Sequence, residues 1–167
     1  MDERSGEEFR EFMHGRWPSM VRLAYGLTGD QGHAEDLAQT AFAKAYASWP
    51  RVCRAGDPDA YVRKIVINES RNLFRKRRVP ERLTDRLPEQ RTADAIQQRD
   101  DRSALIGALQ KLGPRQRAVV VLRYWLDLTE TEAAAVLGCS VGTVKSQAAR
   151  ALASLRKCAE LVDGGLQ

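Results

Sequence analysis

The chain has 167 residues, of which 43% are hydrophobic and 29% charged, with a formal net charge of +5. This composition is that of a globular protein, and the length suffices for one ordinary domain or two small ones. No stretch approaches the roughly 18 apolar residues of a membrane span, and the acidic, polar N-terminus is unlike a signal peptide. We therefore expect no membrane insertion.

Cysteine and histidine usage bears on compartment and chemistry. Cys53, Cys139 and Cys158 are odd in number and far apart, which fits a reducing cytosol and a cytoplasmic location better than a disulfide framework. His14 and His33 lack the spacing of zinc ligands, so we expect no metal and no cofactor. No set of acids or His, Cys and Ser residues converges on a reaction centre, so catalytic residues are not predicted and an enzyme is disfavoured.

A helical N-terminal block is predicted over residues 6–78. Its first helix is expected to be broken or bent near Pro18 and to stop at Thr28-Gly-Asp30. A second helix is predicted from Ala34 to Trp49. Its buried stripe is expected to consist of seven apolar residues: Ala34, Leu37, Ala38, Ala41, Phe42, Ala45 and Trp49. Its other side carries an acidic and amide cluster, Glu35, Asp36 and Gln39, which is either solvated surface or a protein-docking face. The helical wheel alone favours solvated surface.

A basic helix is predicted next, beginning at Asp57-Pro58 and running through Tyr61 to Arg78. One face of it collects five cationic and amide side chains: Lys64, Asn68, Arg71, Asn72 and Arg75. Such a face suits tracking of phosphates with hydrogen bonds to bases. A solvated charge run is the alternative, although the near-absence of acids argues against it.

Residues 79–103 are predicted to form a flexible linker, because Pro80 and Pro88 stand among mixed charges. A second helical block is predicted over residues 104–161. Residues 119–121 are the nearest approach to a strand, but they lie inside a helical pattern. The predicted fold is therefore all-α, with two small helical domains.

The second block contains a predicted helix-turn-helix. Thr129 with Glu132 forms a capping-box pattern that begins a helix, and Gly138 stands where that helix would end in a left-handed residue. Ser140 can then cap the following helix. Small residues between the two helices permit the close crossing that this DNA-binding motif requires.

The second helix of this motif has an outward face of small, hydroxyl and basic side chains. That face comprises Gly142, Thr143, Ser146, Ala149 and Arg150, with Lys145 and Gln147 at its edges. Such a surface can approach base edges in a major groove. The alternative is an ordinary amphipathic helix, which the agreement of turn, caps and spacing disfavours.

Three segments together resemble the extracytoplasmic-function (ECF) group of the sigma-70 family of bacterial RNA polymerase sigma factors. AEDLAQTAF (residues 34–42) looks like the region-two segment that docks on polymerase, and residues 57–78 are similar to the segment that reads and melts the minus-ten element. LGPRQRAVVVLRYWLDLTETEAAAVLGCSVGTVKSQAARAL (residues 112–152) looks like region four, which reads the minus-thirty-five element.

The resemblance implies a role for each set of site residues. Polymerase docking on the β′ clamp helices would use Glu35, Asp36 and Gln39, which reverses the preference for solvated surface. Minus-ten recognition would use Lys64, Asn68, Arg71, Asn72 and Arg75, with a loop over residues 50–58 helping to hold a flipped base. Minus-thirty-five recognition would use Thr143, Lys145, Ser146, Ala149 and Arg150.

The expected function is that of an alternative sigma factor, which directs core polymerase to specific promoters and helps to melt them. The expected partners are promoter DNA, core polymerase through its β′ clamp helices and β flap, and an anti-sigma factor of the kind that holds many family members inactive. The alternative is a stand-alone helix-turn-helix regulator, which would dimerise on a palindromic duplex without polymerase.

Overall fold

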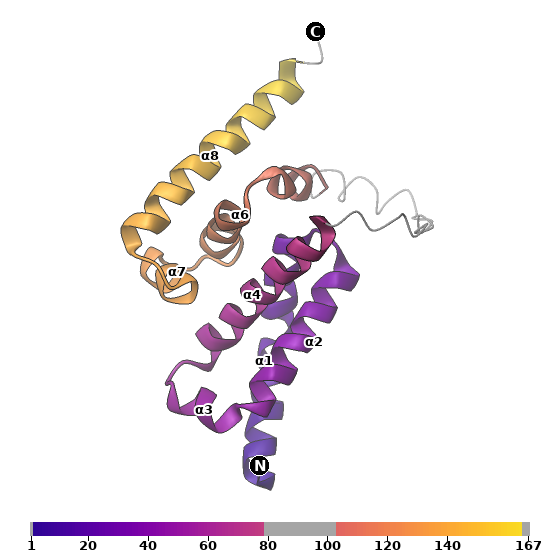
Figure 1. Ribbon diagram of the computed structural model, residues 1–167, viewed down its shortest axis with the longest axis vertical. Helices are drawn as coiled ribbons and strands as arrows, with labels where there is room; N and C mark the ends of the chain where they lie inside the picture. The colour runs from indigo at the N-terminus through magenta and orange to yellow at the C-terminus, as the bar shows by residue number, and fades with distance from the viewer. Residues whose placement is uncertain (1, 79–102, 165–167) are drawn as a thin grey trace.

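The computed structural model describes residues 2–78 and 103–164, and within these ranges the only regular elements are helices. The N-terminal domain contains α1 (Glu3–Thr28), α2 (Gln31–Ala47), α3 (Trp49–Arg54) and α4 (Pro58–Arg78). The C-terminal domain contains a helix over residues 103–111, then α6 (Pro114–Val120), η1 (Val121–Trp125), α7 (Glu130–Leu137) and α8 (Val141–Gly164). The prediction of an all-α fold with two helical domains is confirmed (Figure 1).

Helix α1 begins three residues earlier than the predicted block and runs unbroken through Pro18, so the expected break is wrong. Asp2 caps its first turn by accepting a hydrogen bond from the Ser5 amide, and Gly29 ends it with a φ of 72°. A proline inside a helix removes one backbone hydrogen bond. Burial of Phe9 before it and Met20 after it holds the two halves in one helix.

The core of the N-terminal domain combines small residues of α2 with a cluster of rings. Ala34, Ala38, Ala41 and Ala45 are fully buried, so α1 and α4 can approach α2 closely. Aromatic side chains from three helices meet beside the N-terminal half of α1: Phe9, Phe12, Phe42 and Trp49. The predicted buried stripe of the second helix is confirmed.

The helix-turn-helix forms as its local signals predict. Thr129 Oγ1 accepts from the Glu132 amide at 3.1 Å, and the Glu132 carboxylate accepts from the Thr129 amide at 2.9 Å, which completes a capping box. Gly138 ends α7 with a φ of 66°. Ser140 Oγ accepts from the Thr143 amide at 3.1 Å and so caps α8.

Segment η1 is one turn of π-helix, in which the Leu126 amide donates to the Val121 carbonyl at 3.0 Å. Such turns are rare and bulge out of a regular helix. Val121 and Trp125 both face α1 of the other domain, where a β-carbon on Gly26 would lie 2.9 Å from Val121 Cγ1. The absence of a side chain at Gly26 therefore permits the contact between the two domains.

Figure 1 shows the C-terminal domain against α1 and α4, with α8 projecting away from them. The predicted linker, apart from Ser103, lies outside the described residues. Within the described ranges, none of the helices combines the length and apolar content needed to cross a bilayer.

Candidate nucleic-acid and polymerase interfaces

The basic face predicted on α4 is a stripe of exposed and half-buried side chains. Asp57 precedes the helix and caps its first turn, since its carboxylate accepts from the Ala60 amide at 3.0 Å. Val62, Val66, Ile67 and Ser70 are buried on its inner side. The five predicted minus-ten residues lie on the outer side, where Arg71 is half-buried and the others are exposed: Lys64, Asn68, Arg71, Asn72 and Arg75.

The acid closest in sequence to this stripe faces away from it. Glu69 is 19% exposed and forms an ion pair with Lys44 of α2. The carboxylate therefore joins α4 to α2 instead of neutralising the stripe. The stripe keeps its positive charge toward solvent, as contact with phosphates requires.

The segment ahead of α4 differs from the expected loop. Residues 49–54 form the short helix α3, with Trp49 and Val52 buried against the core. Only residues 55–57 make an exposed turn, in which Gly56 has a φ of 86°. Burial of the two apolar side chains explains the helix, since it gives that segment an inward face.

The predicted polymerase-docking residues share one exposed surface of α2. Glu35, Asp36 and Gln39 are all exposed, opposite the buried alanines. Glu35 accepts a hydrogen bond from Gln31 one turn earlier, at 3.1 Å. The surface is open to a partner, and its role in docking stays a prediction.

The predicted groove-facing residues of α8 are also brought together. Gly142, Lys145, Ser146, Ala149 and Arg150 are exposed, whereas Val144 and Ala151 on the opposite side are buried and belong to the core.

Three of the predicted minus-thirty-five residues have partners within the helix-turn-helix. The hydroxyl of Ser146 donates to the Thr143 carbonyl at 3.1 Å. Thr143 is half-buried, and its hydroxyl lies 2.9 Å from Ser140 Oγ, so the hydroxyl takes part in capping. The ammonium of Lys145 lies 3.7 Å from a carboxylate oxygen of Glu130 on α7. An exposed pair of this kind contributes about 0–1 kcal/mol, so DNA can displace it.

A buried arginine that the sequence-based prediction missed joins the two domains. Arg117 is 2% exposed and donates to the carbonyls of Leu109, Gln110 and Leu112 in its own domain, at 2.8 to 2.9 Å. Its Nη1 donates at 3.2 Å to the carbonyl of Leu27 in the other domain. Burial lowers its pKa from the ordinary arginine value to about 10, so it stays protonated at neutral pH.

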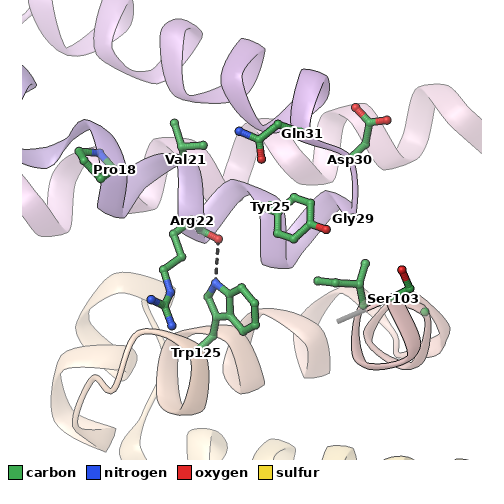
Figure 2. Close-up of a pocket in the computed structure, with 11 residues that line it drawn as sticks. Pro18, Val21, Arg22, Tyr25, Gly29, Asp30, Gln31, Ser103 and Trp125 are labelled. Atoms are coloured by element: carbon green, nitrogen blue, oxygen red, sulfur yellow. Dashed lines mark hydrogen bonds between the residues drawn. The ribbon is translucent and has the colours of Figure 1, made fainter. Parts of the chain in front are cut away.

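A second contact between the domains forms around Trp125 (Figure 2). Its Nε1 donates to the Arg22 carbonyl at 3.0 Å, and the Arg22 guanidinium lies 5.0 Å from the ring centroid. The ring also lies 6.5 Å from that of Tyr25. These residues border an open cleft of about 760 Å³, which α1 and the C-terminal domain share.

A third contact brings together elements assigned to different promoter sites. Ala60 and Arg63 near the start of α4 line a cleft of about 510 Å³ with Thr131 and Val136 of α7. Helix α7 is the first helix of the helix-turn-helix. In this structure the two candidate DNA-reading units therefore lie side by side.

Sequence patterns carried little signal for these interdomain residues. Arg117 stands beside a run of buried valines, where periodicity marks an apolar face but cannot show that one cation shares it. Trp125 and Arg22 are amphipathic, so their positions on a wheel fit either core or surface.

Models of two protein families match the chain. Sigma-70 region 2 matches residues 17–79, and Sigma-70 region 4 matches residues 102–155. The RNA polymerase sigma-E factor of Streptomyces antibioticus is 42% identical over 156 residues, covering 93% of this chain and 87% of the relative. This chain belongs to the sigma-70 family of RNA polymerase sigma factors.

Other relatives place this sigma factor in the ECF group. The sigma-E factor of Streptomyces coelicolor is 43% identical over 90% of this chain and 85% of its own length. The ECF sigma factor SigL of Mycobacterium tuberculosis is 32% identical, over 81% of this chain and 79% of its own length. The protein is thus an alternative sigma factor, and a stand-alone regulator is not favoured because the relatives match both domains.

Solved structures share the fold of this sigma factor. CnrH, in complex with the cytosolic domain of CnrY, superposes with a TM-score of 0.66 at 25% identity, covering 95% of this chain and 90% of CnrH. The sigma factor RpoE of Bartonella quintana, in complex with the anti-sigma factor NepR, superposes with a TM-score of 0.71 at 24% identity. That match covers 92% of this chain and 98% of RpoE.

The matched regions contain every predicted site residue of this sigma factor. The α2 and α4 sets fall within the region 2 match, and the α8 set falls within the region 4 match. Within residues 2–78 and 103–164, no group of three or more His, Cys, Asp or Glu side chains is arranged to hold a metal ion.

Proposed function

We propose that this sigma factor docks core RNA polymerase through the exposed face of α2, at the β′ clamp helices, and reads promoters with α4 and α8. The observation that carries the proposal is the α4 stripe, whose neighbouring acid Glu69 is turned toward Lys44. A stripe that no acid among the described residues neutralises suits the backbone of a nucleic acid, and its amides can bond to bases.

Melting of the minus-ten element would be the task of α4. Separation of the duplex costs about 1.4 kcal/mol per base-pair step. Asn68 is proposed to bind an unstacked base, while Arg71, Asn72 and Arg75 contact the backbone of the same strand. Capture of unstacked bases and contacts to phosphates offset the cost of separation. The protein would perform no covalent chemistry.

Recognition of the minus-thirty-five element would fall to α8. Lys145, Ser146, Ala149 and Arg150 form the exposed face near its start, and a bidentate Arg150–guanine contact would fix the register of the polymerase on the duplex. The β flap is the proposed polymerase contact of this domain.

The two domains would separate when the promoter is bound. Elements at minus ten and minus thirty-five lie about 25 base pairs apart, roughly 85 Å along B-form DNA. In this structure α4 and α7 line one cleft instead. The 24 residues numbered 79–102 can reach about 80 Å when extended, and the two domains add their own length, so the separation is permitted.

Each proposed domain would have its own role. Residues 6–78 would act as region two and residues 104–161 as region four, with residues 79–103 as the connection between them. Such a protein would act in the cytoplasm, where polymerase and promoters are.

An anti-sigma factor is proposed as a further partner. An apolar groove of about 570 Å³ lies between residues 103–111 and α8, lined in part by Leu105, Ala108 and Leu155. Leu105 is 44% exposed. A groove of this composition suits the apolar face of a helix from such a factor.

Transcription in vitro tests the proposal. Purified core polymerase with this protein, on a library of promoter fragments, is expected to give specific start sites that core polymerase alone does not give. Specific binding of the free protein to a palindromic duplex, without specific starts, would favour the stand-alone regulator and contradict the proposal.

A further inference from the structure

A cleft separate from the one beside Trp125 opens between the end of α4 and the turn before α6. Its volume is about 710 Å³, within the range of about 300–1,000 Å³ typical of small-molecule sites. One wall comes from the N-terminal domain and contains Arg71, Phe74 and Arg75. The other wall comes from the C-terminal domain and consists of residues 110–115 and Arg117.

Every ionisable side chain that lines this cleft is a cation: Arg71, Arg75, Lys111, Arg115 and Arg117. Solvated surfaces usually mix charges of both signs. Within residues 2–78 and 103–164, none of these five cations has a carboxylate within 4.0 Å. The cleft therefore concentrates positive potential that the described chain does not neutralise.

The five cations differ in what they can offer a ligand. Arg117 is buried, with its donors directed at backbone carbonyls and its guanidinium 4.2 Å from the centroid of the Phe74 ring. These carbonyls take four of its five N–H groups, so it supplies the cleft mainly with charge. Arg75, Lys111 and Arg115 are exposed, and Arg71 is half-buried, so these four keep donors for a ligand.

The arrangement favours linked phosphates over a single anion. Guanidinium groups bind phosphate oxygens in a bidentate manner, and each phosphate of a chain carries its own charge. The four cations other than Arg117 stand in two pairs, Arg71 with Arg75 on one wall and residues 111 and 115 on the other. A ligand that contacts both pairs must carry several anionic groups in sequence.

We infer that this cleft binds linked phosphate groups, as in a nucleoside triphosphate or a nucleic-acid strand, between Arg71 and Arg75 on one wall and residues 111 and 115 on the other. The inference goes beyond promoter recognition. Because the walls belong to different domains, such a ligand binds the closed arrangement more tightly and stabilises it. It would also occupy two side chains of the α4 stripe.

Calorimetric titration of the full chain tests this site with three probes: inorganic tripolyphosphate, ATP and an oligothymidylate of ten nucleotides. The test variant is Lys111→Ala/Arg115→Ala, which lies outside the proposed promoter contacts. The matched control is Arg156→Ala/Lys157→Ala, which removes the same charge from exposed positions on α8. All four side chains are exposed, so both variants are expected to fold.

Saturable binding of at least one probe is expected, with the affinity reduced about tenfold or more in the test variant and less than threefold in the control. If tripolyphosphate and ATP bind in this manner, the ligand is a free polyphosphate. If only the oligonucleotide does so, the phosphates belong to a nucleic-acid strand. Absence of saturable binding, or equal losses in both variants, would overturn the inference.

Discussion

Arg117 donates a hydrogen bond from Nη1 to the carbonyl oxygen of Leu27, 90 residues earlier in the chain, at 3.2 Å. Leu27 stands in the last turn of α1, where backbone carbonyls lack partners within the helix. Gln110 donates to the same carbonyl at 3.3 Å. The C-terminal domain thus supplies part of the cap of a helix in the N-terminal domain.

Replacement of Arg117 by Met is expected to destabilise the protein strongly. Each buried carbonyl that loses its partner costs about 1–3 kcal/mol. Arg117 serves four carbonyls, of which that of Leu27 keeps the bond from Gln110, so three lose theirs. We expect a loss of at least about 3 kcal/mol in the free energy of unfolding, measured by urea denaturation. Arg115→Met, at an exposed neighbour, should change it by less than about 0.5 kcal/mol. Similar small losses in both variants would contradict the role assigned to Arg117.

Gly26→Ala is expected to push the domains apart while strengthening α1. Alanine stabilises a helix interior by about 0.5–1 kcal/mol relative to glycine, but the new β-carbon would stand 2.9 Å from the buried Val121. Gly15→Ala is the matched control, because that position is open and only the helix gain applies.

Energy transfer between dyes on Cys53 and Cys158, in a Cys139→Ser background, measures the separation of the domains. Cys53 lies on α3 and Cys158 on α8, so the pair spans the two domains. Transfer should fall in Gly26→Ala and stay unchanged in Gly15→Ala. An unchanged distance in both variants would show that the Val121 side chain moves aside without opening the interface.

Trp125→Phe is expected to weaken the closed arrangement modestly. The change keeps most of the ring but removes the hydrogen bond to the Arg22 carbonyl. One such bond stabilises the closed arrangement by about 0.5–1.5 kcal/mol. The same dye pair should show a larger open population. Tyr124→Phe removes a hydroxyl from the neighbouring ring, which is 50% exposed, and should leave the distance unchanged. A decrease in energy transfer of equal size in both variants would argue against the Trp125 contact.

Arg150→Ala is expected to weaken minus-thirty-five recognition. Loss of a bidentate guanine contact removes about 1–3 kcal/mol of discrimination, or roughly 5- to 150-fold in promoter preference. Competition between promoters in transcription assays measures it. Arg156→Ala, at an exposed position six residues further along α8, serves as the control. Unchanged promoter preference in Arg150→Ala would show that Arg150 makes no such contact.

Asn68→Ala is expected to impair melting more than closed binding, because the amide is proposed to bind a base that is exposed only after strands separate. Permanganate footprinting of unpaired thymines measures melting, and gel shift of the polymerase–promoter complex measures binding. Equal reactivity in the variant and the unmodified protein would rule out this role. Lys64→Ala, one turn earlier, should reduce binding and melting together because it would contact phosphates.

The local signals of the sequence were sufficient for the helix-turn-helix. Thr129, Glu132, Gly138 and Ser140 act within three or four residues of themselves, so their capping roles could be predicted without a tertiary structure. The buried alanines of α2 were predictable for the same reason, since helical periodicity alone defines their face. The assigned promoter contacts stay predictions, because their test requires DNA.

Tertiary packing decided what local patterns could not. Pro18 stays within one helix because buried residues on both sides hold it, and residues 49–54 became helical because Trp49 and Val52 found a core. The carbonyls of the other domain that Arg117 and Trp125 bind, those of Leu27 and Arg22, lie 90 and 103 residues away. The other three carbonyls around Arg117 belong to the end of the helix over residues 103–111 and to the turn that follows it. The sequence alone determined the family pattern, the helices and their capped ends, because these depend on neighbours a few residues apart. Only the folded chain decided how the domains meet, because that depends on backbone carbonyls, which every residue carries and no sequence pattern distinguishes.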